Sequence, residues 1–150
     1  MTEIRRIRVD EASIVRELYR GAVDELAKSY PEDRIGISDQ GLSNLETQFR
    51  LGAAHEDEAT FVADEGGELV GFVTASISRG RALPGAVGEI HELSASDGDH
   101  ERRLAETAIR WLSEQGARAI FHTEDAVHPQ REPWESLGFE VDVLRFSRYE

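Results

Sequence analysis

The sequence predicts one α/β domain, and three of its features carry that prediction. The chain has 150 residues, a length typical of a single domain. Some segments place an apolar residue at every second position, as strands do, and others at every third or fourth position, as helices do. These segments follow one another in the order β-α-α-β-β-β-α-β-α-β, which is typical of helices layered on a sheet.

The first third of the chain predicts one strand and two helices. Ile4 to Val9 alternates apolar and basic residues, as a short strand does, and Asp10 is placed to cap the following helix. In that helix, which Pro31 ends, apolar residues recur every four positions: Ile14, Leu18, Ala22 and Leu26. Residues 38–58 carry a weaker helical pattern, with these apolar residues: Leu42, Leu45, Phe49 and Leu51.

The middle of the chain predicts three strands. Phe61 to Ala63 and Leu69 to Ile77 form a hairpin around the Gly66-Gly67 turn, because glycine adopts positive φ without strain. The segment PGAVGEIHELSA, residues 84–95, is the third strand.

The last third predicts a helix, a strand, a helical turn and a closing strand. The helix ends near Gly116 and has one apolar stripe: Leu104, Ala105, Ala108, Ile109 and Leu112. Residues 117–124 form the strand, residues 128–138 the helical turn and residues 139–149 the closing strand.

The charge balance excludes some partners. Thirty Asp and Glu against 17 basic residues give a net charge of −13, and every basic residue except Lys28 is arginine. Such a chain repels nucleic acid and anionic membranes. Its self-repulsion is relieved in molar salt, where the Debye length falls to about 3 Å. The composition resembles that of cytoplasmic proteins of salt-accumulating halophiles; an ordinary acidic protein is the alternative.

The chain contains no cysteine, which excludes disulfides, thiolate zinc sites and a cysteine nucleophile. No apolar run approaches the roughly 20 residues that span a bilayer. The charged start, MTEIRRIRVDEAS, lacks the apolar region of a signal peptide. We therefore expect a soluble, cytoplasmic protein.

Three motifs, in their order and spacing, resemble the GNAT superfamily of N-acetyltransferases. FVADEGGELVGFVTASI, residues 61–77, is similar to the family's central hairpin. GEIHELSA, residues 88–95, is similar to its fourth strand, which precedes the pyrophosphate loop. PWESLGFEVD, residues 133–142, is similar to its x-Y-E-K-L-G-F segment.

The resemblance implies a GNAT-like fold over residues 1–150, with a mixed, mostly antiparallel sheet and flanking helices. It implies an acyl-CoA-dependent N-acyltransferase that transfers an acetyl or acyl group from acetyl-CoA to an amine. In such an enzyme, backbone groups of Leu93 and Ala95 would contact the pantetheine. The implied residues around the pyrophosphate are Gly98, Asp99, His100, Arg102, Arg103 and Leu104.

The sequence departs from the family pattern in two places. The family loop reads Q/R-x-x-G-x-G/A, whereas here only Gly98 is kept, among Asp97, Asp99 and Glu101. Alternatively the segment is a helix cap, in which Asp97 or Asp99 satisfies the backbone N–H groups. The second departure is Trp134, which stands where many relatives have a proton-donating tyrosine; an indole N–H cannot take that role.

Amine acylation needs a group that removes the ammonium proton. The resemblance favours Glu89 as this base, and Glu92 and His91 are close to it in sequence. Strict alternation puts Glu89 and His91 on one face of the strand and Glu92 on the other, unless a bulge changes the register.

Two other interpretations stay open. Fold does not determine function, so the chain could be a non-catalytic GNAT-like binding module that has lost acyl-CoA binding. A metal site is a further alternative, although its spacings match no recognised zinc motif and we expect no metal. Its candidate ligands are His91, His122, His128, Glu92, Glu124 and Asp125.

The expected partner is a small-molecule or peptide amine, and a homodimer is a possible assembly. In the GNAT superfamily, which this sequence resembles, the first two helices and their connection form the acceptor site. The corresponding segment here is roughly residues 25–56. A cationic acceptor would suit the acidic residues in and beside it: Asp24, Glu25, Glu32, Asp33 and Asp39.

Overall fold

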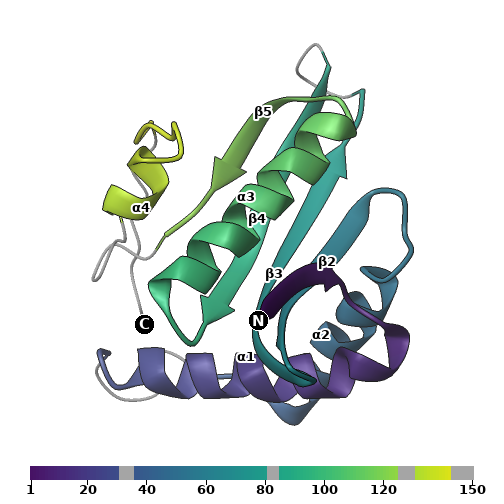
Figure 1. Ribbon diagram of the computed structural model, residues 1–150, viewed down its shortest axis with the longest axis vertical. Helices are drawn as coiled ribbons and strands as arrows, with labels where there is room; N and C mark the ends of the chain where they lie inside the picture. Colours follow the sequence, from purple (N-terminus) through teal and green to yellow (C-terminus); the bar gives the residue numbers. More distant parts are fainter. Residues whose placement is uncertain (31–35, 81–84, 125–130, 143–150) are drawn as a thin grey trace.

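The computed structural model describes residues 1–30, 36–80, 85–124 and 131–142. The elements are β1 (Thr2–Arg6), the 3₁₀ turn η1 (Val9–Glu11), α1 (Ala12–Ala27), α2 (Asp39–Leu51), β2 (Glu58–Glu65), β3 (Glu68–Ser78), β4 (Ala86–Ala95), α3 (Gly98–Glu114), β5 (Ala117–His122) and α4 (Arg131–Glu135). This order confirms the predicted succession of strands and helices as far as α4 (Figure 1).

The five strands form one mixed sheet in the order β1-β2-β3-β4-β5. The first four strands are antiparallel neighbours, and β5 pairs with β4 in parallel. The β2–β3 hairpin turns at Gly66 and Gly67, whose φ angles of 63° and 98° explain why glycine occupies both positions. The prediction of a hairpin at this turn is confirmed.

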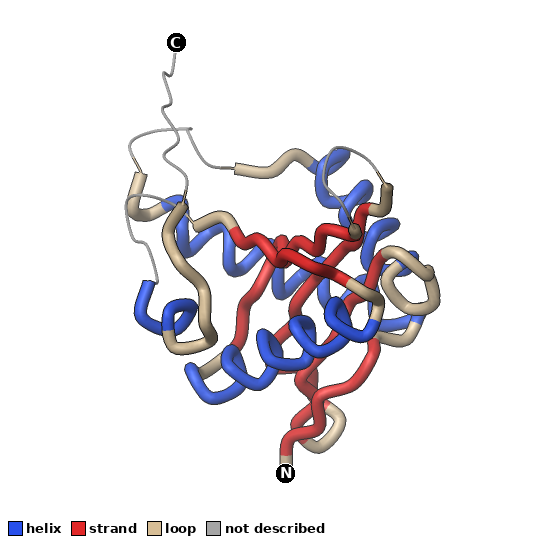
Figure 2. Tube along the Cα trace, turned by 90° about the horizontal axis from the view of Figure 1, so that it is seen from above, coloured by secondary structure: helices blue, strands red, loops and turns tan. Residues whose placement is uncertain are grey.

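Helices cover both faces of the sheet (Figure 2). On one face α3 packs on the central strands, and the core there includes the fully buried Ile90, Leu104 and Leu112. On the other face α1 and α2 cover a second core around Phe49 and Phe72. The central strands therefore bury both faces, and β4 is held from two sides.

The entry into α1 differs from the prediction. β1 ends at Arg6 rather than Val9, and Asp10 lies in η1 without capping α1. Glu11 takes the polar contacts instead: its side chain accepts a hydrogen bond from Arg8 N at 2.8 Å and pairs with Arg5 at 2.7 Å. Because this carboxylate ties the turn to β1, the helix begins at Ala12, one residue later than a cap at Asp10 would place it.

Part of the predicted closing strand is wrong. Residues 139–142 belong to no strand, and the rest of that prediction, residues 143–149, lies outside the described residues. The reason is local: Phe139 N donates to Trp134 O at 3.1 Å, and the Phe139 ring packs edge-on against Trp134. The start of the segment is thus used to close α4. Within the described residues, each helix is too short or too polar to cross a bilayer.

Candidate active site

A bulge divides β4 into two halves. Val73 pairs with Leu93 but Ala75 pairs with Ile90, so β4 has one more residue here than β3. Ile90 and Leu93 consequently both pack toward the α3-side core, although they are three positions apart. The expectation of strict alternation is wrong at this point, and the alternative of a bulge is confirmed.

Beyond the bulge, β4 and β5 part. The last pair between them joins Ile90 and His122, whereas β4 stays paired with β3 as far as Ala95. A cavity of about 970 Å³ lies at this opening. Its walls come from α1, β4, the first turns of α3, the end of β5 and α4, and Figure 1 shows β5 turning toward α4.

Glu92 and Glu89 lie in different surroundings. Glu92 lines the cavity and its backbone N donates to Thr74 Oγ1 at 3.0 Å. Burial raises the pKa of the Glu92 carboxyl, while positive charge on His91 and His122 acts in the opposite direction. The Glu89 side chain is 49% exposed, lies 3.8 Å from His91 Nδ1 and is outside the cavity lining.

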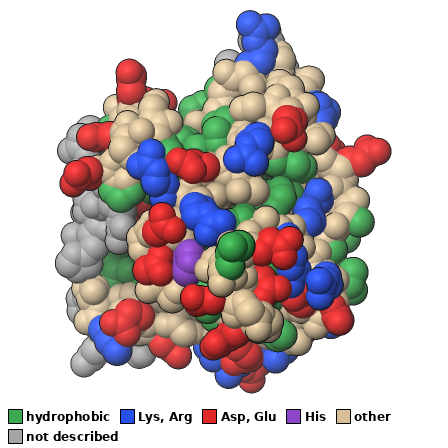
Figure 3. All heavy atoms as spheres, in the orientation of Figure 1, with side chains coloured by type: hydrophobic (Ala, Val, Ile, Leu, Met, Phe, Trp, Pro, Cys, Tyr) green, Lys and Arg blue, Asp and Glu red, His purple; other side chains and the backbone are tan. Residues whose placement is uncertain are grey.

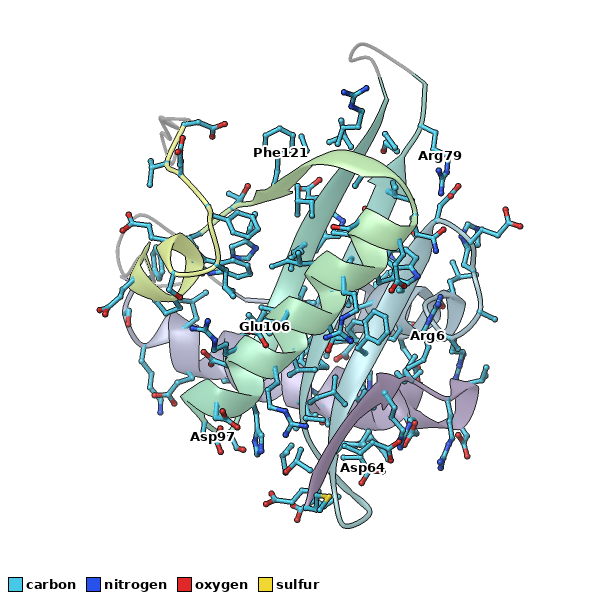
Figure 4. The ribbon with its side chains drawn as sticks, turned by 45° about the horizontal axis from the view of Figure 1, so that its top comes forward. Arg6, Asp64, Arg79, Asp97, Glu106 and Phe121 are labelled. Carbon is cyan, nitrogen blue, oxygen red and sulfur yellow. The ribbon has the colours of Figure 1, made fainter. Side chains whose placement is uncertain are left out.

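The loop before α3 is a helix cap. Asp97 Oδ1 accepts a hydrogen bond from His100 N at 2.8 Å, and Figure 4 shows Asp97 at the start of α3. The His100 ring is buried, with Nδ1 3.2 Å from Asp97 Oδ2 and Nε2 3.0 Å from Thr2 Oγ1. The interpretation of Asp97 as a cap is confirmed, and this carboxylate occupies part of the helix terminus that would otherwise bind an anion.

The first turns of α3 add one more carboxylate and one arginine to the cavity wall. Burial raises the pKa of Glu101, and the charges of Glu124 and Asp97 raise it further. Arg102 contacts Glu106 Oε1 through Nε at 3.0 Å and Ser136 Oγ through Nη1 at 3.2 Å. The described contacts therefore engage two of the three nitrogens of its guanidinium.

The residues expected to bind the acyl donor are only partly brought together. Leu93, Gly98 and Arg102 line the cavity. The others lie outside its lining: Ala95 against the α3-side core, Asp99 exposed, His100 turned to Thr2, Arg103 donating to Thr2 O at 3.0 Å, and Leu104 fully buried.

His122, Glu124 and Trp134 form a cluster at the point where β4 and β5 part. His122 Nδ1 lies 2.9 Å from Ile90 O and Nε2 lies 3.1 Å from Glu124 Oε1. Trp134 Nε1 donates to the same Glu124 oxygen at 2.7 Å. The indole also stacks on the imidazole, with ring centroids 3.9 Å apart and an interplanar angle of 25°.

The cavity is acidic. Five carboxylate side chains line it, against Arg102 as the single Arg or Lys in its described wall. These carboxylates come from five different parts of the fold, namely α1, β4, α3, the segment after β5 and α4: Glu25, Glu92, Glu101, Glu124 and Glu132. On the surface face of Figure 3, by contrast, carboxylates and arginines are interspersed.

The histidines expected in the metal alternative do not gather as a ligand set among the described residues. His122 meets Glu124, and His91 instead contacts Ser76 Oγ through Nε2 at 2.7 Å. Asp125 and His128 lie outside the described residues. In the described part of the chain, the group whose ligand atoms lie within 4.8 Å of one another is Asp97, Asp99 and His100.

Two contributors to the cavity are not predicted by the sequence. Tyr19 of α1 lines it, and burial, with a contribution from the Glu92 charge, raises the pKa of its hydroxyl. The His122–Glu124 pair is predicted from the sequence only as part of a possible metal site. Nothing in the sequence near Tyr19 signals this position, because it depends on where α1 crosses the open end of β4.

Comparison with protein families gives one match. A model described as the acetyltransferase (GNAT) family matches residues 15–139. No curated protein shows significant sequence similarity to the chain.

Solved structures share the fold at low sequence identity. A transcriptional regulator from Bacillus halodurans is 17% identical, with a TM-score of 0.76 over 100% of both chains. An aminoglycoside N-acetyltransferase in complex with CoA is 19% identical, with a TM-score of 0.71 over 99% of this chain and 95% of that one. Glucosamine-6-phosphate N-acetyltransferase from Arabidopsis thaliana is 13% identical, with a TM-score of 0.67 over 99% and 98%.

Proposed function

The chain belongs to the GNAT family of acetyltransferases, and from this premise we propose that it transfers an acetyl group from acetyl-CoA to a cationic amine. The observation that carries the proposal is the opening between β4 and β5. Past Ile90, β4 pairs only with β3 among the described strands, so its other edge presents backbone groups to the cavity. An extended acyl chain could use those groups as a further strand would.

The β4 edge fits the arm of the donor. Leu93 and Ser94 line the cavity, and backbone N–H groups along this edge are suited to polarise a thioester carbonyl. The donor would supply an activated acyl group and a thiol leaving group. The CoA complex of the aminoglycoside N-acetyltransferase, a protein of the same fold, supports this assignment by analogy.

Glu92 is the base that the surroundings favour. Its carboxyl lines the cavity, and burial raises its pKa, which brings a carboxylate closer to the range in which it accepts a proton at neutral pH. Glu89, which the resemblance favours, is half exposed and outside the cavity lining. We propose that Glu92 takes the ammonium proton, and Glu89 stays a second candidate.

The charges of the cavity favour a cationic acceptor. Five carboxylates face one arginine, and that arginine already contacts Glu106 and Ser136. An amine that carries one or more positive charges would gain from these carboxylates, whereas an anionic acceptor would be repelled. Of the acidic residues expected at the acceptor site, Glu25 lines the cavity; Glu32 and Asp33 lie outside the described residues.

The start of α3 is a poor match for the diphosphate of CoA. Asp97 already accepts from His100 N, and Glu101 stands at the cavity wall in the next turn. This observation favours the second candidate function, a binding module of the same fold that does not use acyl-CoA. The two candidates differ in one measurable property, which is affinity for CoA.

Isothermal titration with acetyl-CoA at 0.1 M and 2 M KCl tests the proposal, followed by thiol-release assays with 1,5-diaminopentane and, as an anionic acceptor, glutamate. We expect acetyl-CoA to bind and the diamine to be acetylated in preference to glutamate. If the folded protein binds no acetyl-CoA at either salt concentration, the acyltransferase proposal is wrong and the binding-module alternative replaces it.

A further inference from the structure

The hydrogen bonds of His122 fix the position of one proton. Its ring is buried, with the side chain 7% exposed, and Nδ1 lies 2.9 Å from Ile90 O. A carbonyl oxygen can only accept, so Nδ1 carries the hydrogen. The ring therefore bridges from the end of β5 to the last β4 residue that pairs with β5.

The other ring nitrogen requires a second proton. His122 Nε2 lies 3.1 Å from Glu124 Oε1, and that oxygen already accepts from Trp134 Nε1 at 2.7 Å. If Nδ1 alone were protonated and Glu124 were ionised, two lone pairs would face each other at hydrogen-bonding distance. A proton between Nε2 and Oε1 removes this conflict, either on the imidazole or on the carboxyl.

Trp134 holds both partners of the pair. Its indole stacks on the imidazole at 3.9 Å between ring centroids, and an aromatic face stabilises an adjacent cation. Its N–H fixes the Glu124 carboxylate. Trp134 cannot itself donate a proton to a substrate, but it positions a pair that can.

The pair faces other ionisable groups across the cavity. Glu92 and His91 of β4, Glu101 and Arg102 of α3 and Glu132 of α4 line the same space. The negative charges among them favour keeping the extra proton on the pair. The Glu124 side chain is 33% exposed, against 7% for His122, so Glu124 is the partner that can deliver the proton to a ligand in the cavity.

We propose that Glu124 is the proton donor to the departing thiol and that His122 is the positioning residue that holds its proton. This inference rests on the proposed acyl transfer. Glu92 takes one proton from the ammonium group; the amine nitrogen then bonds to the carbonyl carbon, and the C–S bond breaks with its electron pair on sulfur. Glu124 gives the shared proton to sulfur, the second amine proton replaces it on the pair, and Glu92 releases its proton to water.

Tyr19 is the competing donor. Its hydroxyl has a raised pKa and lines the same cavity, but from the α1 side, where its ring packs against Phe49 and Phe72. A Tyr19→Phe variant removes the hydroxyl and keeps this packing.

Histidine NMR tests the shared proton directly. Long-range ¹H–¹⁵N spectra would be recorded between pH 5 and 9, with ¹³C detection of the Glu124 carboxyl and assignment through His122→Gln. At pH 7 we expect one of two protonation states. In the first, both ring nitrogens of His122 are protonated; in the second, His122 is protonated on Nδ1 and the Glu124 carboxyl carries the other proton. In Glu124→Gln, which keeps an acceptor for Trp134 and a donor for Nε2, the extra proton should be lost. An unprotonated Nε2 beside an ionised Glu124 in the unmodified protein would overturn the proposal.

Kinetics with acetyl-CoA and 1,5-diaminopentane test the donor role. Glu124→Gln should lower kcat about 10²-fold with little change in the KM for acetyl-CoA, since a positioned acid contributes on this scale. The fall in kcat at alkaline pH, where the pair loses its proton, should disappear in this variant. Glu114→Gln, an exposed carboxylate at the far end of α3, is the matched control and should leave kcat within twofold.

The outcomes separate the two proposals. If Tyr19→Phe abolishes turnover and Glu124→Gln keeps it within twofold, the donor is Tyr19 and the inference is wrong. If the unmodified protein neither binds nor uses acetyl-CoA, the proposed function fails and the donor role fails with it, while the NMR result still decides whether the pair holds a proton.

Discussion

The two halves of β4 differ in what holds them. Residues 87–90 pair with β3 on one side and β5 on the other, and α3 packs against them so closely that a Cβ at Gly88 would lie 2.9 Å from Leu112 Cδ2. Residues 93–95 pair with β3 alone among the described strands. The bulge at His91–Glu92 separates a half that is structural from a half that is open to a ligand.

The difference shows how one strand can both stabilise the sheet and leave backbone groups open to a ligand. A half that is paired on both sides, with Ile90 in the core, fixes the position of the strand, so the open half can carry ionisable groups without collapsing on them. The cost of the open half is visible at Glu92, whose carboxyl is partly desolvated. Substitutions in the first half should therefore change stability, and substitutions in the second half should change activity.

The largest expected effect is on stability, from Ile90→Ala. Ile90 is 1% exposed in the core under α3, so its truncation should cost about 2–5 kcal/mol of unfolding free energy. Leu93→Ala, at a partly buried position beyond the bulge, should cost less. Urea unfolding of both variants measures this, and equal losses would show that the two halves are equally structural.

The next effect is on turnover, from Glu92→Gln and Glu89→Gln. These carboxylates lie three positions apart on β4, Glu89 before the bulge and Glu92 within it, so they form a matched pair. Glu92→Gln should lower kcat about 10²-fold, the contribution of a positioned base, and Glu89→Gln should change it much less. The reverse order in a steady-state assay would return the role of base to Glu89.

A smaller effect is expected at the start of α3. Asp97→Asn keeps an oxygen that can cap the helix and removes one negative charge near the expected diphosphate. The repulsion between that charge and the diphosphate is roughly 1 kcal/mol, so CoA should bind about fivefold tighter at low salt without it. In molar KCl the difference should vanish because the charge is screened. Titration across a KCl series checks this. A Kd identical to that of the unmodified protein at low salt would place the diphosphate elsewhere.

Circular dichroism across the same KCl series would also show whether the acidic chain melts at a higher temperature in salt.

The smallest effect is on the pH dependence of stability. Because burial raises the pKa of Glu92 in the folded state, this group opposes folding as pH rises above its unfolded value of about 4.3. Glu92→Gln should therefore match the unmodified protein near pH 4 and gain a few degrees in Tm by pH 7. A lower Tm for the variant at pH 7 would mean that the ionised carboxylate has a favourable partner.

Most of the fold was predictable because local patterns match local structure. The Gly66-Gly67 turn, the apolar stripe of α3 and the stop at Gly116 are each fixed by neighbours in sequence. The errors occur where a distant contact decides the outcome. Glu11 holds the start of α1 through Arg5 of β1, and Phe139 closes α4 instead of extending a strand.

The candidate site was predictable only in part. Glu92 and the cap at Asp97 follow from residue type and position, and the bulge was one of two expectations for β4. His122 contacts Ile90 O, and Glu124 contacts Trp134. These contacts depend on where β4 and β5 part and on where α4 packs against them. No spacing in the sequence encodes that geometry.

The contacts of Thr2 have a practical consequence for protein production. Its hydroxyl contacts His100 and its carbonyl accepts from Arg103, so the first residues of the chain hold the beginning of α3. Met1 is fully exposed beside them. A purification tag fused ahead of Met1 would start one residue from these bonds and could loosen the helix that borders the cavity. Affinity and kinetic comparisons between variants should therefore use protein from which any such tag has been removed.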